Sequence, residues 1–184
     1  MRIAYIVFDG ITWLDLIGLY DPISRLKTHY RTDITWDICA LTATVQDNHG
    51  LQVHATKVNA SLVDYDVLVV PGGVGTRSLM HDTGFLAWMQ TARQVKQKIS
   101  ICTGSLLLGA AGFLKDKKAT THFGEYETLK GYCREVCMDR IVEDGDVLTA
   151  GAVAASLDLG LYLCEKWAGP EAAHDIRRRM NYKG

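Results

Sequence analysis

The chain has 184 residues, of which 48% are hydrophobic and 22% charged, and its formal net charge is −1. These values are ordinary for a soluble globular protein with a sizeable core, so we expect one domain over residues 1–184. The near-neutral charge excludes the basic footprint of a protein that binds nucleic acid or an anionic membrane. No apolar run approaches the ~18 residues that a membrane span requires.

The N-terminus and the cysteines indicate the compartment. The apolar run that follows Met1 is ended at once by Asp9 and Gly10, so we expect no signal peptide. Five cysteines, an odd number, without an export signal favour reduced thiols in a cytoplasmic protein. Cys133 and Cys137 have the spacing C-x3-C, but no second pair of ligands follows, so we expect no metal site.

The N-terminal half predicts strands separated by turns and helical segments. Runs of β-branched and aromatic residues predict three strands, at residues 2–8, 35–41 and 66–70. Residues 11–26 have apolar side chains at helical spacing, but Pro22 interrupts the pattern, and Asp21 before it is typical of a helix start. We therefore expect one kinked helix or two short ones. Residues 43–45 and 51–55 flank a turn and predict a hairpin.

The C-terminal half continues the alternation. Apolar residues at helical spacing predict helices at residues 85–96, 124–131, 152–168 and 171–180. Strand patterns occupy residues 136–144 and 147–150, and residues 113–122 form a loop with a possible strand. Strands that alternate with helices throughout predict an α/β fold with a mainly parallel sheet.

The stretch from Lys98 to Gly112 combines a short buried strand, a turn centred on Cys102 and a helix that opens at Ser105. This order is that of a nucleophile elbow, which presents a side chain above a sheet. The unpaired N–H groups and the dipole of the helix favour negative charge, so we expect a thiolate at Cys102. The alternative is a buried packing cysteine, the commoner role of a lone cysteine beside an apolar strand.

Two other segments follow strands at the edge of the predicted sheet where ligands bind. Residues 71–75 (Pro-Gly-Gly-Val-Gly) let the backbone offer N–H groups to a developing negative charge, although a tight turn also explains the glycines. Asp15 has apolar neighbours that raise a carboxyl pKa, which suits an acid or base, but its spacing from Thr12 also fits a helix cap. His122 is either a base for the cysteine or a structural histidine on an apolar strand.

Four motifs in combination resemble the ThiJ/PfpI superfamily, across nearly the whole chain. They are Leu14-Asp-Leu-Ile-Gly18, Val70-Pro-Gly-Gly-Val-Gly75, Ser100-Ile-Cys-Thr-Gly-Ser-Leu-Leu-Leu-Gly-Ala-Ala-Gly112 and Ala119-Thr-Thr-His-Phe123. The branch that they resemble most contains isonitrile hydratase and the amidotransferase-like domains of AraC-type regulators. The Cys-Thr-Gly elbow together with Leu-Asp-Leu is fairly specific for this branch, and the Gly-Gly loop is shared more widely.

The resemblance implies a flavodoxin-like three-layer sandwich with a nucleophile elbow, usually as a homodimer. It implies hydration of an isonitrile to an N-substituted formamide without a metal or an organic cofactor. Cys102 would then be the nucleophile, Asp15 the acid and base, and Thr103 the residue that orients the thiol or the water. Backbone N–H groups of Gly73 and Val74 would stabilise developing charge.

Two rival functions stay open. The first is another cysteine enzyme of the superfamily, which acts on glyoxals or on an amide. The second is a redox-sensing or ligand-binding module that keeps the reactive thiol without catalysis. Regulators of the same branch carry a helix-turn-helix domain after this one, and the sequence ends at Gly184. The expected partners are therefore a small-molecule substrate and a second copy of the chain, and not nucleic acid.

Overall fold

A seven-stranded sheet forms the centre of the computed structural model, which describes residues 1–183. Its strands are β1 (Arg2–Ile6), β2 (Thr35–Ala40), β5 (Lys57–Val58), β6 (Val67–Val70), β7 (Gln97–Ile101), β10 (Ile141–Asp144) and β11 (Val147–Ala150). In space they follow the order β10-β11-β7-β6-β1-β2-β5, and all neighbours are parallel except β10 and β11. The predicted α/β fold with a mainly parallel sheet is confirmed.

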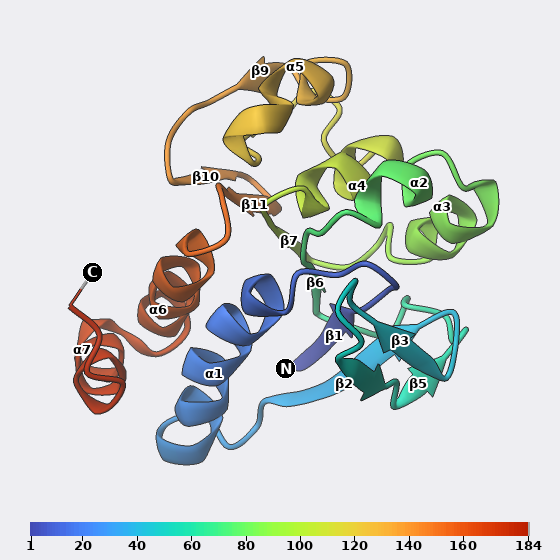
Figure 1. Ribbon diagram of the computed structural model, residues 1–184. Helices are drawn as coiled ribbons and strands as arrows, with labels where there is room; N and C mark the ends of the chain where they lie inside the picture. Colours follow the sequence, from blue (N-terminus) through green and yellow to red (C-terminus); the bar gives the residue numbers. More distant parts are fainter. Residues whose placement is uncertain (184) are drawn as a thin grey trace.

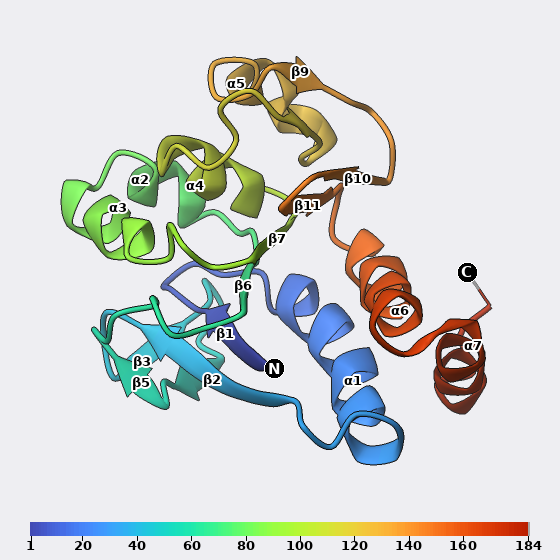
Figure 2. The ribbon, with the colours of Figure 1, turned by 180° about the vertical axis from the view of Figure 1, so that it is seen from behind.

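Helices cover both faces of this sheet. One layer contains α1 (Trp13–His29), α6 (Ala155–Ala168) and α7 (Pro170–Arg179), and the other contains α2 (Thr76–Leu79), α3 (Thr83–Gln90) and α4 (Gly104–Ala110) (Figures 1 and 2). Because both faces are covered, β6 is apolar and buried along its whole length. Within residues 1–183, none of the helices is both long and apolar enough to cross a membrane.

Smaller elements lie outside the main sheet. β3 (Thr44–Gln46) and β4 (Gln52–His54) pair in antiparallel fashion and confirm the predicted hairpin. β8 (Lys118–Ala119) pairs with β9 (Glu135–Val136), and η1 (Phe123–Glu125) and α5 (Tyr126–Leu129) lie between them in the chain. The single strand predicted at residues 136–144 is therefore wrong, since its two ends belong to different sheets.

Helix α1 is one continuous helix with Pro22 inside it, so the first of the two predicted alternatives is confirmed and no helix starts at Asp21. Asp21 lies within the helix and pairs with Arg25 one turn later, at 2.9 Å. A proline inside a helix costs about 3 kcal/mol, so another interaction must compensate for it. The Pro22 ring packs on α6, where a Cβ at Gly160 would come within 2.8 Å of its Cγ atom.

A second glycine lets α1 and α6 approach each other near the start of both helices. A Cβ at Gly18 would lie 2.1 Å from the Ser156 hydroxyl oxygen, which is far inside van der Waals contact. The same hydroxyl lies 3.0 Å from the Leu14 carbonyl oxygen, to which it donates. The first turn of α1, which includes Asp15, is therefore held against α6.

Helix α3 ends at Gln90 and does not extend to Lys96 as its apolar periodicity predicts. The hydroxyl of Thr91 donates to the Trp88 carbonyl at 2.7 Å and accepts the Leu62 N–H at 2.9 Å. These local bonds hold the chain in a turn that leads into β7.

Candidate active site

Cys102 occupies a strained turn between β7 and α4. Its φ of 54° lies in the left-handed region, which residues with a side chain rarely adopt. Its N–H donates to the carbonyl oxygens of Ala150 at 3.0 Å and Gly151 at 2.9 Å. Its own carbonyl accepts hydrogen bonds from the hydroxyls of Ser105 at 3.1 Å and Thr121 at 3.0 Å. Three separate segments thus fix this backbone conformation, which is that of a nucleophile elbow.

Asp15 lies beside this turn, in the first turn of α1, and is completely buried. Its Oδ2 atom accepts a hydrogen bond from the Gly72 N–H at 2.9 Å. Its Oδ1 atom accepts none from any residue that the structure describes. Thr12 occupies the N-cap position of α1 as its spacing from Asp15 predicts, but its side chain makes no cap hydrogen bond, so the capping box does not form. The carboxyl points instead to the glycine loop and the elbow.

The pKa of Asp15 is raised to about 7, chiefly because the carboxyl is buried. The Gly72 N–H and the Cys102 side chain both interact with the carboxylate and lower the pKa, but they do not cancel the cost of burial. At neutral pH this carboxyl therefore exists in both its charged and its neutral form. A group in that state can both donate and accept a proton during a reaction.

The pKa of the Cys102 thiol is raised to about 11, first by burial and then by the negative charge of Asp15. The N–H and hydroxyl of Thr103 and the N–H of Val153 act on the sulfur and lower the pKa, but by less. The thiolate expected from the helix dipole is therefore wrong for the resting protein. Only 5% of Cys102 is exposed, and the loss of hydration outweighs the favourable amides.

Alkylation of Cys102 by iodoacetamide will be slow at neutral pH. Because only the thiolate reacts, the rate will rise about tenfold per pH unit and level off only near pH 11. The measurement is the modified fraction of the peptide that contains Cys102, followed by mass spectrometry. A rate that is already constant between pH 7 and 9 would show that the thiol is ionised at rest.

Thr103 connects the elbow to the glycine loop. Its hydroxyl accepts the Gly73 N–H at 3.1 Å and donates to the Gly73 carbonyl at 3.2 Å. A Cβ at Gly72 would lie 2.7 Å from the Thr103 nitrogen and 2.8 Å from the Asp15 Oδ2 atom, so only glycine fits there. The Gly73 N–H, which sequence reasoning assigned to developing charge, thus already has a partner inside the protein.

Cys102 lines a cavity of about 170 Å³ at the carboxyl ends of the parallel strands. The other lining residues are Thr12, Gly73, Val74, Arg77, Thr103, His122 and Val153. Sequence reasoning selected Cys102, Thr103, Gly73 and Val74 among them, but it missed Arg77 and Val153. Asp15 is not among the lining residues, and its charge acts on the Cys102 thiol, which is one of them.

His122 lies at the cavity wall but not on a strand. It begins η1, where its Nδ1 atom accepts the Gly124 N–H at 3.1 Å, and its ring stacks on Phe123 at 4.2 Å between centroids. Nearby, Arg77 donates to the Gly73 carbonyl at 3.0 Å and to Glu125 at 2.7 Å. These contacts hold η1 against the glycine loop. No motif in the sequence indicated that Arg77 would lie there.

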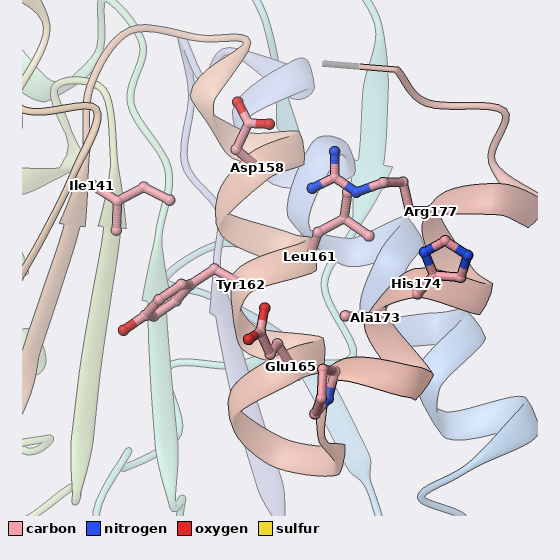
Figure 3. A pocket seen from close by; sticks show the side chains of 9 residues that line it. Ile141, Asp158, Leu161, Tyr162, Glu165, Ala173, His174 and Arg177 are labelled. Carbon is pink, nitrogen blue, oxygen red and sulfur yellow. The ribbon is translucent and has the colours of Figure 1, made fainter.

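A larger cavity, of about 330 Å³, lies between α6, α7 and β10, and it shares no lining residue with the first (Figure 3). Asp158 in its wall accepts hydrogen bonds from Arg140 and Tyr182, and Tyr162 donates to Glu143 at 2.6 Å. Several of its polar groups are therefore engaged within the protein. The reactive groups gather at the smaller cavity, which is the candidate active site.

Comparison with known proteins finds relatives of this chain. The family model described as DJ-1/PfpI matches residues 1–166. An isonitrile hydratase from Pseudomonas putida is 33% identical over 184 residues, which cover 99% of this chain and 78% of that protein. A crystal structure of a ThiJ/PfpI family protein from Pseudomonas syringae is 31% identical, with a TM-score of 0.91, and covers 100% of this chain and 75% of the other.

A crystal structure of an AraC family transcriptional regulator, also from Pseudomonas putida, has a TM-score of 0.82 at 20% identity. The match covers 97% of this chain and 98% of the other, and at this identity it shows a shared fold alone. The family model and the two relatives above 30% identity match most or all of this chain, so they show its family as well as its fold. The chain belongs to the DJ-1/PfpI family.

Proposed function

We propose that this protein hydrates an isonitrile to an N-substituted formamide, with Cys102 as the nucleophile and Asp15 as the acid and base. One observation carries the proposal. A thiol at the wall of a small cavity interacts with a buried carboxyl whose pKa of about 7 lies at neutral pH. The similarity to a protein named isonitrile hydratase supports this class of reaction.

In the first step, the sulfur of Cys102 and one proton add to the terminal carbon of the isonitrile. Asp15 takes the thiol proton and delivers it to that carbon as the C–S bond forms, which gives a thioimidate. The carbon gains both new bonds, so no oxidant or reductant is needed. Proton transfer by a positioned group of suitable pKa typically contributes about 10²–10⁴-fold to a rate.

In the second step, water adds to the thioimidate carbon, and Asp15 relays its proton towards the nitrogen. The tetrahedral intermediate then collapses, the C–S bond breaks, and sulfur recovers a proton as the formamide leaves. The N–H groups of Thr103 and Val153, which lower the pKa of the thiol, stabilise negative charge on the departing sulfur. The net reaction consumes one isonitrile and one water.

The raised pKa of Cys102 disfavours the role of a redox sensor. Cysteines that sense oxidants have low pKa values and are accessible to solvent, because the thiolate is the form that reacts. Cys102 is almost fully buried, and its pKa of about 11 lies above the ordinary thiol value. Both features suit a nucleophile that is deprotonated only when a substrate is bound.

The test is the incubation of wild-type protein with methyl and n-butyl isonitrile, with the formamide products followed by NMR. We expect formamide at a rate proportional to protein concentration. Methylglyoxal serves as the parallel substrate, because lactate from it would identify a glyoxalase. Lack of formamide from every isonitrile in the series would refute the proposed function.

A further inference from the structure

The cavity at Cys102 adjoins a second one. This outer cavity, of about 310 Å³, is lined by Gly10, Ile11, Thr12, Trp13, Asp47, Asn48, His49 and Val74. Thr12 and Val74 line both cavities, so the two lie side by side between Cys102 and the turn that joins β3 to β4. Val74 stands at their junction and is 53% exposed. The inner cavity alone has room only for a small reactive group and a few attached atoms.

The walls of the outer cavity are fixed relative to each other. The Gly10 N–H donates to the Gln46 carbonyl at 2.8 Å, and the Gln46 N–H donates to Asp9 Oδ1 at 2.9 Å. These two bonds attach the hairpin to the segment that connects β1 with α1. The outer cavity is thus a preformed part of the fold, as small-molecule sites usually are.

Asp47 gives the outer cavity its charge. Its Oδ1 atom accepts the N–H groups of His49 at 2.8 Å and Leu51 at 3.0 Å, which fix the carboxylate within the turn. Burial raises the pKa of Asp47, but these N–H groups together with the charge of His49 outweigh that effect, so the pKa lies below its ordinary value. No lysine or arginine is among the residues that line this cavity.

The charged groups differ between the two cavities. At the inner end, Arg77 is held by Glu125 and by the Gly73 carbonyl, and its charge is largely balanced there. At the outer end, the lining holds the Asp47 carboxylate, the indole of Trp13 and the imidazole of His49, whose charge helps to lower the pKa of Asp47. Carboxylates and aromatic rings are the groups with which proteins recognise organic cations.

We propose that the outer cavity binds the substituent of the substrate, and that it takes an alkyl chain that ends in an ammonium group. The inference rests on the proposed function, because it places the isonitrile carbon at Cys102. The chain then passes over Thr12 and Val74, and its cationic end lies at Asp47. Asp47 is a specificity-determining residue in this arrangement, with no part in the chemical steps.

The first test compares n-butyl isonitrile with its analogue that carries a terminal ammonium group, on wild type and on Asp47→Asn. The asparagine keeps the Oδ1 acceptor that closes the turn and removes only the charge. We expect wild type to prefer the ammonium substrate in kcat/KM, and Asp47→Asn to reduce this preference by about two- to fivefold, the range for one exposed ion pair. The change will lie in KM.

The matched control is Asp64→Asn, which removes one exposed carboxylate just before β6, at the amino ends of the parallel strands and so opposite the two cavities. This variant will keep the wild-type preference. Equal preferences in wild type and Asp47→Asn, or an equal loss in Asp64→Asn, would overturn the subsite, because the effect would then be absent or due to net charge alone.

The second test does not depend on isonitrile chemistry. Cys102 is labelled with a neutral alkyl methanethiosulfonate and with its aminoethyl analogue, in which the thiolate attacks the sulfenyl sulfur and methanesulfinate leaves. Wild type will react faster with the cationic reagent, and Asp47→Asn will lower the ratio by about two- to fivefold. If no isonitrile is turned over, the proposed function fails, and this ratio alone decides the subsite. An unchanged ratio refutes it.

Discussion

Replacement of Cys102 by alanine will reduce isonitrile turnover by at least about 10³-fold, because no other group at the cavity can form the thioimidate. Cys137→Ser is the matched control, since it removes a partly exposed thiol that does not line the cavity. The measurement is formamide production under identical conditions for the three proteins. We expect Cys137→Ser to retain the wild-type rate.

The folding of the variant must be verified, because position 102 has a φ of 54°. Alanine meets the same steric restriction in the left-handed region as cysteine, so the circular dichroism spectrum should not change. Cys102→Ser provides a second variant, with a hydroxyl that is a much weaker nucleophile at this pH. If both folded variants retain a tenth or more of the activity, the nucleophile lies elsewhere.

Asp15→Asn will have opposite effects on activity and on stability. Turnover will fall, because an amide cannot relay a proton. The free energy of unfolding at pH 9 will rise, because a carboxylate that burial disfavours is replaced by a neutral group of the same shape. A pKa raised from 3.8 to about 7 corresponds to a cost of about 4 kcal/mol for the ionised form, so we expect a gain on the order of 2–4 kcal/mol.

The direction of this change in the free energy of unfolding follows from the protonation of Asp15 at each pH. The folded wild type holds a proton on Asp15 between pH 3.8 and about 7, whereas the unfolded chain has lost it. The stabilisation that the protonated Asp15 gives to the folded protein is therefore complete below pH 3.8 and is lost as the pH rises to about 7. Urea denaturation of both proteins at pH 4 and pH 9 measures the difference, which will be small at pH 4. An equal difference at both values would contradict a raised pKa.

The layout of the fold was predictable because hydrophobic runs and turn residues carry that information locally. β6 is apolar along its whole length, and the hairpin of β3 and β4 flanks an evident turn. The predictions that failed concern features that contacts between distant segments determine. The sequence around Pro22 contains a helix-start signal, but packing against Gly160 outweighs it. A local pattern cannot report a glycine more than a hundred residues away.

The candidate site was predictable in its position and not in its electrostatics. Cys102 and Asp15 follow strands whose ends meet, so their proximity follows from the parallel sheet. The pKa of the thiol depends on how completely neighbouring segments exclude water, and no motif reports that quantity. The amide of Val153 acts on the sulfur only because the segment before α6 folds over the elbow. For the same reason, no sequence motif indicates that Arg77 lines the cavity.

The way in which the hairpin is attached has a consequence for how this protein can diversify. Its two bonds to the preceding segment involve only the backbone of Gln46, so its turn can change residues without loosening the attachment. Asp15, by contrast, lies on a helix whose glycine contacts permit no larger side chain. The roles proposed for Asp15 and Asp47 therefore place chemistry and substrate preference on parts of the chain with very different tolerance to mutation. Laboratory evolution confined to residues 47–51 should yield new specificities while the reaction stays the same.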